Sequence, residues 1–129
     1  MLAGCTRDFY MGLIQNIRTL PGSREKSMEQ RVKEHLCQVY GLGLDDVEEL
    51  YGLGCQTVAA TLGRLESAFL RSDAQEVADA GHMLKGALFN MGLLELGELA
   101  RALELAGKAG RMEEARAVYG ALCPALKFF

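Results

Sequence analysis

The spacing of hydrophobic residues predicts helices along most of the chain. Apolar residues recur at intervals of three and four, the period of an amphipathic helix, and no segment alternates as a half-buried strand does. We therefore expect an all-α protein. The predicted helices cover residues 27–40, 45–71, 74–91, 94–109 and 111–122.

Residues at the predicted helix ends support these boundaries. Ser27, with Gln30 three residues later, has the form of a capping box. Asp45 or Asp46 is expected to cap the second helix, because a carboxylate accepts hydrogen bonds from free backbone amides. Gly92 is expected to end the third helix.

Two features predict irregularities within the helices. Gly52 and Gly54 fall inside the 45–71 segment, where each glycine costs about 1 kcal/mol relative to alanine, so they indicate a kink or break. Pro124 is expected to end or kink the last helix, because its ring removes a backbone donor and clashes with the preceding turn.

Short connections between long amphipathic helices favour neighbours that run antiparallel. We expect residues 45–126 to form an antiparallel up-down four-helix bundle, with the 27–40 helix as an additional N-terminal helix packed across one end. Residues 1–26 are expected to be a separate leader, which is either poorly ordered or a short accessory helix. The leader has its own apolar stripe, formed by Phe9, Leu13, Ile17 and Leu20.

The composition limits the kinds of partner. The chain has 129 residues, which corresponds to one domain, and a net charge of −3, so it lacks the basic character of nucleic-acid-binding proteins. No stretch approaches the ~18 apolar residues that a membrane-spanning helix needs. We expect neither a nucleic acid nor a membrane as partner.

The cysteine spacing gives no sign of a metal site. None of the spacings is C-x-x-C, and the two histidines, His35 and His82, do not complete a zinc pattern. This favours reduced thiols in a cytoplasmic protein without a metal or cofactor of its own. The four cysteines are Cys5, Cys37, Cys55 and Cys123.

The third predicted helix places a histidine outside the core. Its apolar stripe is centred on Leu84, and His82 lies about 160° away from that centre at ~100° per residue. Lys85 and Gly86 border the imidazole one turn on, and Ala78 borders it one turn back. The small residues leave room for a phosphoryl group or a partner's surface, and Lys85 supplies a charge suited to phosphate oxygens.

An exposed imidazole is suited to phosphoryl chemistry. It is largely neutral near neutral pH, and its nitrogen can attack a phosphoryl group without a separate base. The phosphoramidate that forms stays reactive enough to be passed on. The alternative is a surface histidine that stands beside a lysine and a glycine by chance. His35 lies on the apolar side of the 27–40 helix and is interpreted as a packing residue.

The segment His82-Met83-Leu84-Lys85-Gly86 closely resembles the H-x-L-K-G motif of histidine-containing phosphotransfer (HPt) domains. Those domains also have a glycine ten residues after the histidine, which Gly92 matches. The Asp73 turn and the helical hairpin of residues 94–122 occur where such domains have them. The resemblance covers about residues 45–126. We expect the HPt-like unit to include residues 27–126, and the leader has no counterpart in the family.

The resemblance implies a phosphocarrier rather than an enzyme. HPt domains accept a phosphoryl group on the histidine from an aspartate of a receiver domain and donate it to another receiver, which supplies the Mg²⁺. By position, His82 is then the phosphoacceptor, Lys85 the phosphate-neutralising residue, and Gly86 a clearance residue together with Ala78. The expected partners are response-regulator receiver domains and hybrid histidine kinases, and the protein itself is expected to be a monomer without an ATP-binding domain.

One residue departs from the family pattern. Phe89 lies about 20° from His82 in rotation, where HPt domains usually have a small residue. It is either an aromatic docking anchor for a receiver, with Asn90 beside it, or a core residue under the neighbouring helix.

Two other functions stay open at this stage. One is a helical adaptor of the same fold that carries no phosphate. The other is an oligomeric structural bundle, with the leader and the Lys127-Phe128-Phe129 tail as dimer contacts.

Overall fold

The computed structural model describes residues 27–126, and its five helices confirm the predicted all-α class. No strand occurs between residues 27 and 126. The leader over residues 1–26 and the Lys127-Phe128-Phe129 tail lie outside the described residues. The helices are α2 (Met28–Tyr40), α3 (Leu44–Leu70), α4 (Ala74–Asn90), α5 (Leu94–Lys108) and α6 (Met112–Leu126).

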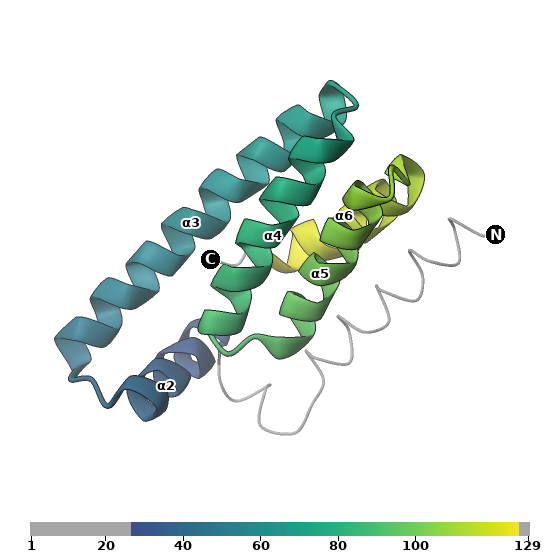
Figure 1. Ribbon diagram of the computed structural model, residues 1–129. Helices are drawn as coiled ribbons and strands as arrows, with labels where there is room; N and C mark the ends of the chain where they lie inside the picture. The colour runs from purple at the N-terminus through teal and green to yellow at the C-terminus, as the bar shows by residue number, and fades with distance from the viewer. Residues whose placement is uncertain (1–26, 127–129) are drawn as a thin grey trace.

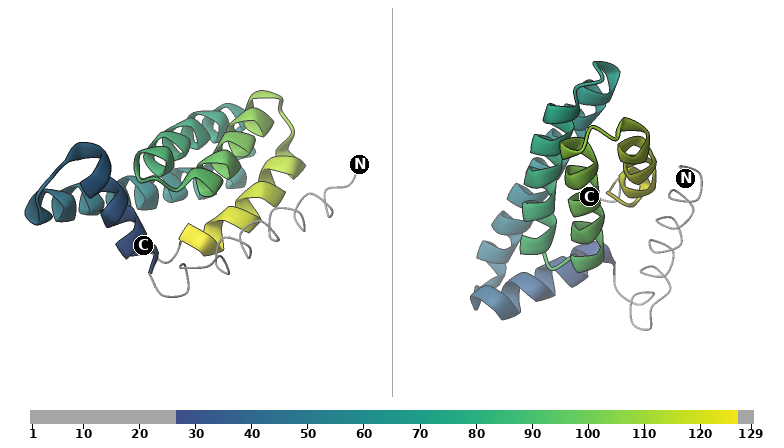
Figure 2. Two further views of the ribbon diagram at one scale, coloured as in Figure 1. Left: turned by 90° about the horizontal axis from the view of Figure 1, so that it is seen from below. Right: turned by 45° about the vertical axis from the view of Figure 1, so that its right-hand side comes forward.

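Helix α4 lies between α3 and α5 and packs against both of them (Figure 1). Helix α6 packs mainly against α5 and makes less contact with α3. The two further views show α6 beside α5 (Figure 2). Helix α2 contacts α3 at the end of the molecule where the α4–α5 turn lies. There the imidazole of His35 packs against Gly92, which agrees with the interpretation of His35 as a packing residue.

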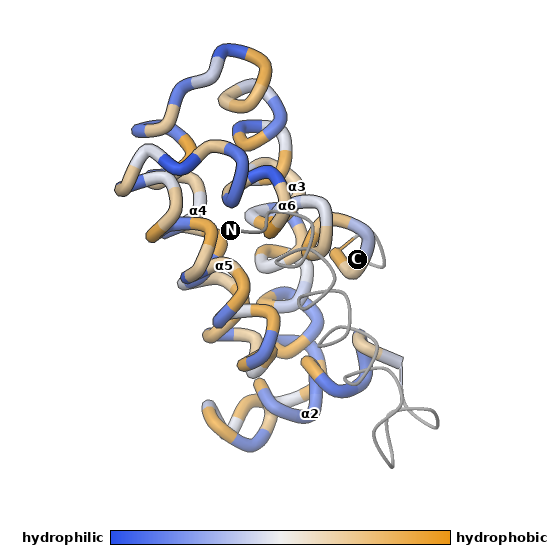
Figure 3. Tube along the Cα trace, turned by 90° about the vertical axis from the view of Figure 1, so that its right-hand side faces the viewer, coloured by the Kyte–Doolittle hydropathy of each residue, from blue (hydrophilic) through white to orange (hydrophobic). Residues whose placement is uncertain are grey.

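The core receives residues from all five helices, and each helix alternates between hydrophobic and hydrophilic stretches (Figure 3). Leu84 and Leu88 of α4 are fully buried, as the helical period predicts. Burying a leucine side chain contributes about 1.5–3 kcal/mol, so these two residues fix the rotation of α4 about its axis. The opposite face of α4 is thereby directed outward.

The helix ends follow the predicted signals with one exception. Ser27 and Gln30 form a reciprocal capping box, and the Asp73 side chain accepts a hydrogen bond from the backbone of Glu76 at 3.1 Å. Gly92 follows α4 with φ +78°, a conformation that glycine adopts without strain. The expected carboxylate cap of α3 is wrong: its N-cap is Gly43, which makes no side-chain hydrogen bond.

Neither α3 nor α6 breaks or ends at the predicted position, and the alternative of a kink stays a prediction. Helix α3 runs unbroken from Leu44 to Leu70, and a Cβ on Gly54 would lie only 3.0 Å from the Met91 sulfur, so this glycine makes room for a side chain of the core. Helix α6 continues past Pro124. Because Ala125 and Leu126 are buried, their packing holds the last turn in place although proline removes one hydrogen bond.

No helix within residues 27–126 is long and apolar enough to span a bilayer.

Candidate phosphoryl-acceptor site

His82 projects from the outward face of α4, and its side chain is 66% exposed. Two features of the sequence place it there. Asp73 caps the helix two turns earlier, and Leu84 anchors the opposite face in the core. The structure therefore gives His82 the solvent-facing position that the helical period predicts.

A buried carboxylate of the neighbouring helix lies against the imidazole. Glu104 of α5 has a side chain only 5% exposed, and its Oε2 lies 3.0 Å from Nδ1 of His82. The periodicity of α5 predicts that Glu104 faces solvent, and this expectation is wrong. Sequence reasoning therefore missed the residue that contacts the histidine.

Glycines at the α4–α5 crossing explain the burial of Glu104. A Cβ on Gly81 would lie 3.0 Å from the backbone nitrogen of Glu104, and a Cβ on Gly107 would lie 2.7 Å from that of Ala78. The two backbones thus approach more closely than larger residues would permit, and the Glu104 side chain is enclosed between the helices. These mid-helix glycines are the sequence signal from which a close crossing could have been inferred.

Two lysines share this carboxylate. Lys85 Nζ lies 2.8 Å from Oε1 of Glu104, and Lys108 Nζ lies 3.1 Å from Oε2. Glu104 and Lys108 are one turn apart on α5, the spacing at which a glutamate and a lysine pair on a helix. Lys85 was expected beside a phosphate on the outer face, and in the structure it pairs with Glu104.

These contacts determine the charge of Glu104. Burial alone raises the pKa of Glu104, but hydrogen bonds from Lys85, Lys108 and His82 outweigh that effect and lower the pKa to about 2. Glu104 is therefore ionised near neutral pH, and an ionised carboxylate only accepts hydrogen bonds. The hydrogen in the contact must belong to Nδ1 of His82. In the neutral ring, the lone pair then resides on Nε2.

The small residues near His82 occupy different environments. A Cβ on Gly86 would meet nothing within 4 Å, so this side of the imidazole is open. Ala78 is 1% exposed and packs against Gly107, which corrects the expectation that it lies on the outer face. The reason is again the close crossing, since α5 covers the turn of α4 that precedes His82.

Phe89 and Asn90 differ in their exposure to solvent. A Cβ on Gly97 would lie 2.6 Å from the Phe89 ring, so this half-buried ring packs on α5. Of the two interpretations of Phe89, the structure agrees with packing under the neighbouring helix. Asn90, the last residue of α4, is exposed.

An open apolar groove of about 660 Å³ lies between α2, α3 and α4. Met83, which follows His82 directly, lines the groove together with Ala87 and Asn90 of the same helix. Leu53 and Tyr40 line its other sides and are about half exposed. A continuous apolar surface of this kind is typical of a protein-binding site.

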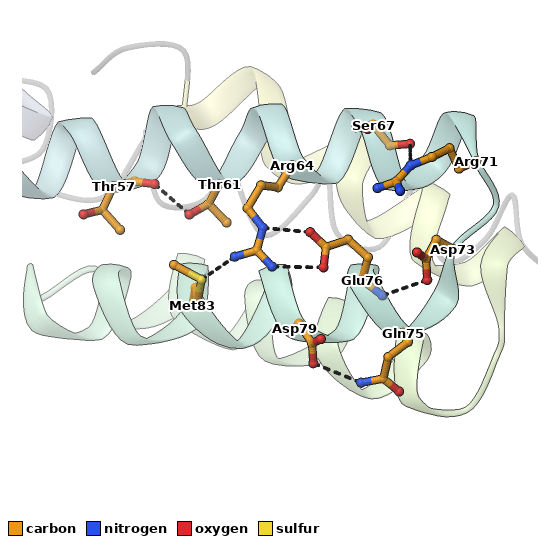
Figure 4. Close-up of polar contacts among 10 residues, drawn as sticks. All are labelled: Thr57, Thr61, Arg64, Ser67, Arg71, Asp73, Gln75, Glu76, Asp79 and Met83. Carbon is orange, nitrogen blue, oxygen red and sulfur yellow. Dashed lines mark hydrogen bonds and ion pairs between the residues drawn. The ribbon is translucent and has the colours of Figure 1, made fainter.

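A polar bridge between α3 and α4 borders the groove (Figure 4). Arg64 donates two hydrogen bonds to the carboxylate of Glu76, at 2.8 and 3.0 Å, and a third contact of 2.6 Å joins its Nη1 to the sulfur of Met83. Figure 4 shows Arg64 reaching across from α3 to both residues of α4. The bridge therefore joins α3 to α4 next to Met83, the neighbour of His82.

The described residues contain no group of three or more histidine, cysteine, aspartate or glutamate side chains suited to hold a metal ion.

A known protein family matches the part of the chain that forms this site. The family model of the Hpt domain matches residues 49–126, a range that includes most of α3 and all of α4, α5 and α6. His82, Lys85 and Glu104 all lie within it. No curated protein and no solved structure matches the chain.

Proposed function

Because the chain belongs to the Hpt domain family, we propose that it relays phosphoryl groups between receiver domains by way of a phosphohistidine at His82. Hpt domains act in phosphotransfer of two-component systems, and they are phosphocarriers without kinase activity. The donor is an aspartyl phosphate of one receiver domain, in a hybrid histidine kinase or a response regulator. The acceptor is an aspartate of another receiver.

The observation that carries the proposal is the contact between Glu104 and Nδ1 of His82. Because this contact keeps the hydrogen on Nδ1, the Nε2 lone pair is free to react. The lone pair attacks the phosphorus, the bond from phosphorus to the aspartyl oxygen breaks, and the aspartate carboxylate leaves. No proton has to leave the ring in this step, and transfer to the next receiver is the reverse reaction.

The carboxylate also matches the charge of the product. Bonding of phosphorus to Nε2 while Nδ1 keeps its hydrogen gives the ring a positive charge. Glu104, ionised and 3.0 Å away, stabilises that charge. The site thus favours the phosphorylated ring electrostatically. Lys85, one turn from His82, is a source of positive charge for the phosphoryl oxygens, and Gly86 leaves them open space.

Receiver docking is assigned to the α2–α3–α4 groove. Met83 lines the groove and directly follows His82 in the sequence, so we infer that a partner seated in the groove reaches His82. We infer that an apolar helix face of the receiver fills the groove and brings the phosphorylated aspartate to Nε2. The receiver supplies the Mg²⁺ and the remaining catalytic groups.

The proposal includes the architecture that presents the site. We infer that residues 27–126 form one unit, in which α3–α6 are an antiparallel up-down four-helix bundle and α2 crosses one end. Successive helices that pack side by side and are joined by turns of a few residues support this arrangement.

The test is phosphotransfer from the receiver domains of the source organism, each phosphorylated on aspartate with a radioactive label. The wild-type protein is expected to take up label that is labile to acid and stable to base. His82→Gln is expected to take up none, while His35→Gln, which changes the histidine that packs against Gly92, keeps the labelling. Circular dichroism checks that both variants are folded.

Two results would contradict the proposal. Absence of label on the wild-type protein with every receiver would favour the adaptor that carries no phosphate. Undiminished labelling of His82→Gln would assign the phosphoryl group to another residue.

A further inference from the structure

We propose that Lys108 of α5 is a second phosphate-binding residue, which moves from Glu104 to the phosphoryl group when His82 is phosphorylated. This inference rests on the proposed function. The resemblance in sequence assigns the neutralising role to Lys85 alone, and Lys108 belongs to a different helix. The argument starts from how the two lysines share one carboxylate.

Lys108 contacts the same oxygen atom as the histidine. Its Nζ lies 3.1 Å from Oε2 of Glu104, and Nδ1 of His82 lies 3.0 Å from that oxygen. Lys85 instead contacts the other oxygen, Oε1, at 2.8 Å. The ammonium group of Lys108 is therefore separated from the imidazole by a single carboxylate oxygen.

The two lysines differ in how firmly they are held. The side chain of Lys85 is 25% exposed, whereas that of Lys108 is 61% exposed. Because most of the Lys108 side chain is in contact with water, its ammonium group can leave Glu104 for another anion without being desolvated, and Lys85 stays in contact with the carboxylate. The four-carbon stem of Lys108 is flexible, and its charge is not restricted to one direction of approach.

Phosphorylation changes the balance of charge around Lys108. Before phosphorylation, Glu104 is the anion in contact with both lysines, so the three side chains together carry one excess positive charge. The phosphoryl group adds up to two negative charges, and the ring gains one positive charge that competes for Glu104. Both changes favour release of Lys108 from Oε2 and its binding to phosphoryl oxygens.

The position of phosphotransfer equilibrium tests this movement. A labelled receiver domain is mixed with an equal amount of the protein, and the share of label on each partner is measured when it no longer changes. Lys108→Gln is expected to shift the equilibrium constant roughly tenfold toward the receiver, since a charge-assisted contact of about 1.5 kcal/mol is lost from the phosphorylated state alone. Lys108→Arg, which keeps the charge, is expected to restore most of the wild-type value.

The matched control removes the same charge elsewhere on α5. Arg101 has a side chain 60% exposed and pairs with Glu98, so Arg101→Gln is expected to leave the equilibrium unchanged. A Lys108 that stays on Oε2 of Glu104 in both states competes there with the positively charged phosphorylated ring. Its loss would then leave the equilibrium unchanged or shift it toward the phosphorylated protein.

The outcomes separate the two proposals. If the wild-type protein accepts label at His82 and Lys108→Gln has the wild-type equilibrium, the role of Lys108 is wrong while the relay stands. An equal shift with Arg101→Gln would also overturn it, because the effect would then be one of net charge. If the wild-type protein accepts no label from any receiver, both proposals fail together.

Discussion

Oε2 of Glu104 lies 3.0 Å from Nδ1 of His82, although the two residues belong to different helices and stand 22 positions apart in the sequence. The carboxylate is buried and ionised, and the imidazole is exposed. A buried acceptor thus orients the imidazole of His82 without removing it from solvent. The contact leads to separate predictions about the tautomer of His82, the rate of transfer and the stability of the fold.

The tautomer of His82 is expected to depend on Glu104. In the wild-type protein at pH 8, ¹⁵N NMR should show the hydrogen on Nδ1. In Glu104→Ala the carboxylate that accepts this hydrogen is absent, so the ring should populate the other tautomer as well.

Transfer from a phosphorylated receiver should slow roughly tenfold in Glu104→Ala, the loss expected for one charge-assisted hydrogen bond. Glu98→Gln, on the exposed face of the same helix, is the control. An Nδ1–H tautomer that persists in Glu104→Ala would contradict the proposed role of the carboxylate.

The stability of the protein is expected to depend on pH through Glu104. Its pKa is lowered from 4.5 to about 2 on folding, so its ionisation stabilises the fold above pH 4.5, and this contribution is lost as the pH falls toward 2. The contribution is on the order of 3 kcal/mol near neutral pH. Urea unfolding between pH 2 and pH 7 should show that Glu104→Gln lacks this part of the pH dependence. If the free energies of unfolding of the wild-type protein and of Glu104→Gln change with pH in parallel, the low pKa of Glu104 is wrong.

A charge in the groove is expected to block receivers without affecting the histidine. Leu53 lines the groove and is 52% exposed, and Leu105 on α5 is 55% exposed and does not line it. Leu53→Glu should lower kcat/KM for transfer from a receiver by at least about fivefold, because it puts a charge into an apolar groove, while Leu105→Glu should not. Phosphoramidate, a small phosphoryl donor that needs no docking, should label both variants equally. Equal transfer by both variants would place receiver docking elsewhere.

Substitutions of Gly86 distinguish the effect of open space beside His82 on transfer from the effect of helix propensity on the stability of the protein. A Cβ there meets no atom within 4 Å, so Gly86→Ala should stabilise the protein by about 0.5–1 kcal/mol through helix propensity and keep its transfer rate. Gly86→Gln should also be more stable, yet slower in transfer, because its side chain crowds the imidazole one turn away. Thermal unfolding and the labelling assay measure the two effects. If Gly86→Gln transfers as fast as the wild-type protein, Gly86 has no clearance role.

The sequence alone determined the helices and the outward position of His82. The helical period of buried residues such as Leu84 fixes which face of α4 meets the core, and local hydrogen bonds at Ser27 and Asp73 start two of the helices. These are interactions within one helix, or between one helix and an apolar interior. They can be inferred without knowing what lies on the other side of that interior. The H-x-L-K-G motif likewise spans little more than one turn of a single helix.

Only the tertiary structure decided what lies next to the histidine. The period of α5 places Glu104 on its polar face, but periodicity does not state how closely two helices approach. Gly81 and Gly107 let the backbones of α4 and α5 come so near that a polar position is enclosed between them, and the same crossing buries Ala78. The partners of Glu104 come from both helices, so its low pKa and the orientation of His82 arise only when the two helices pack together.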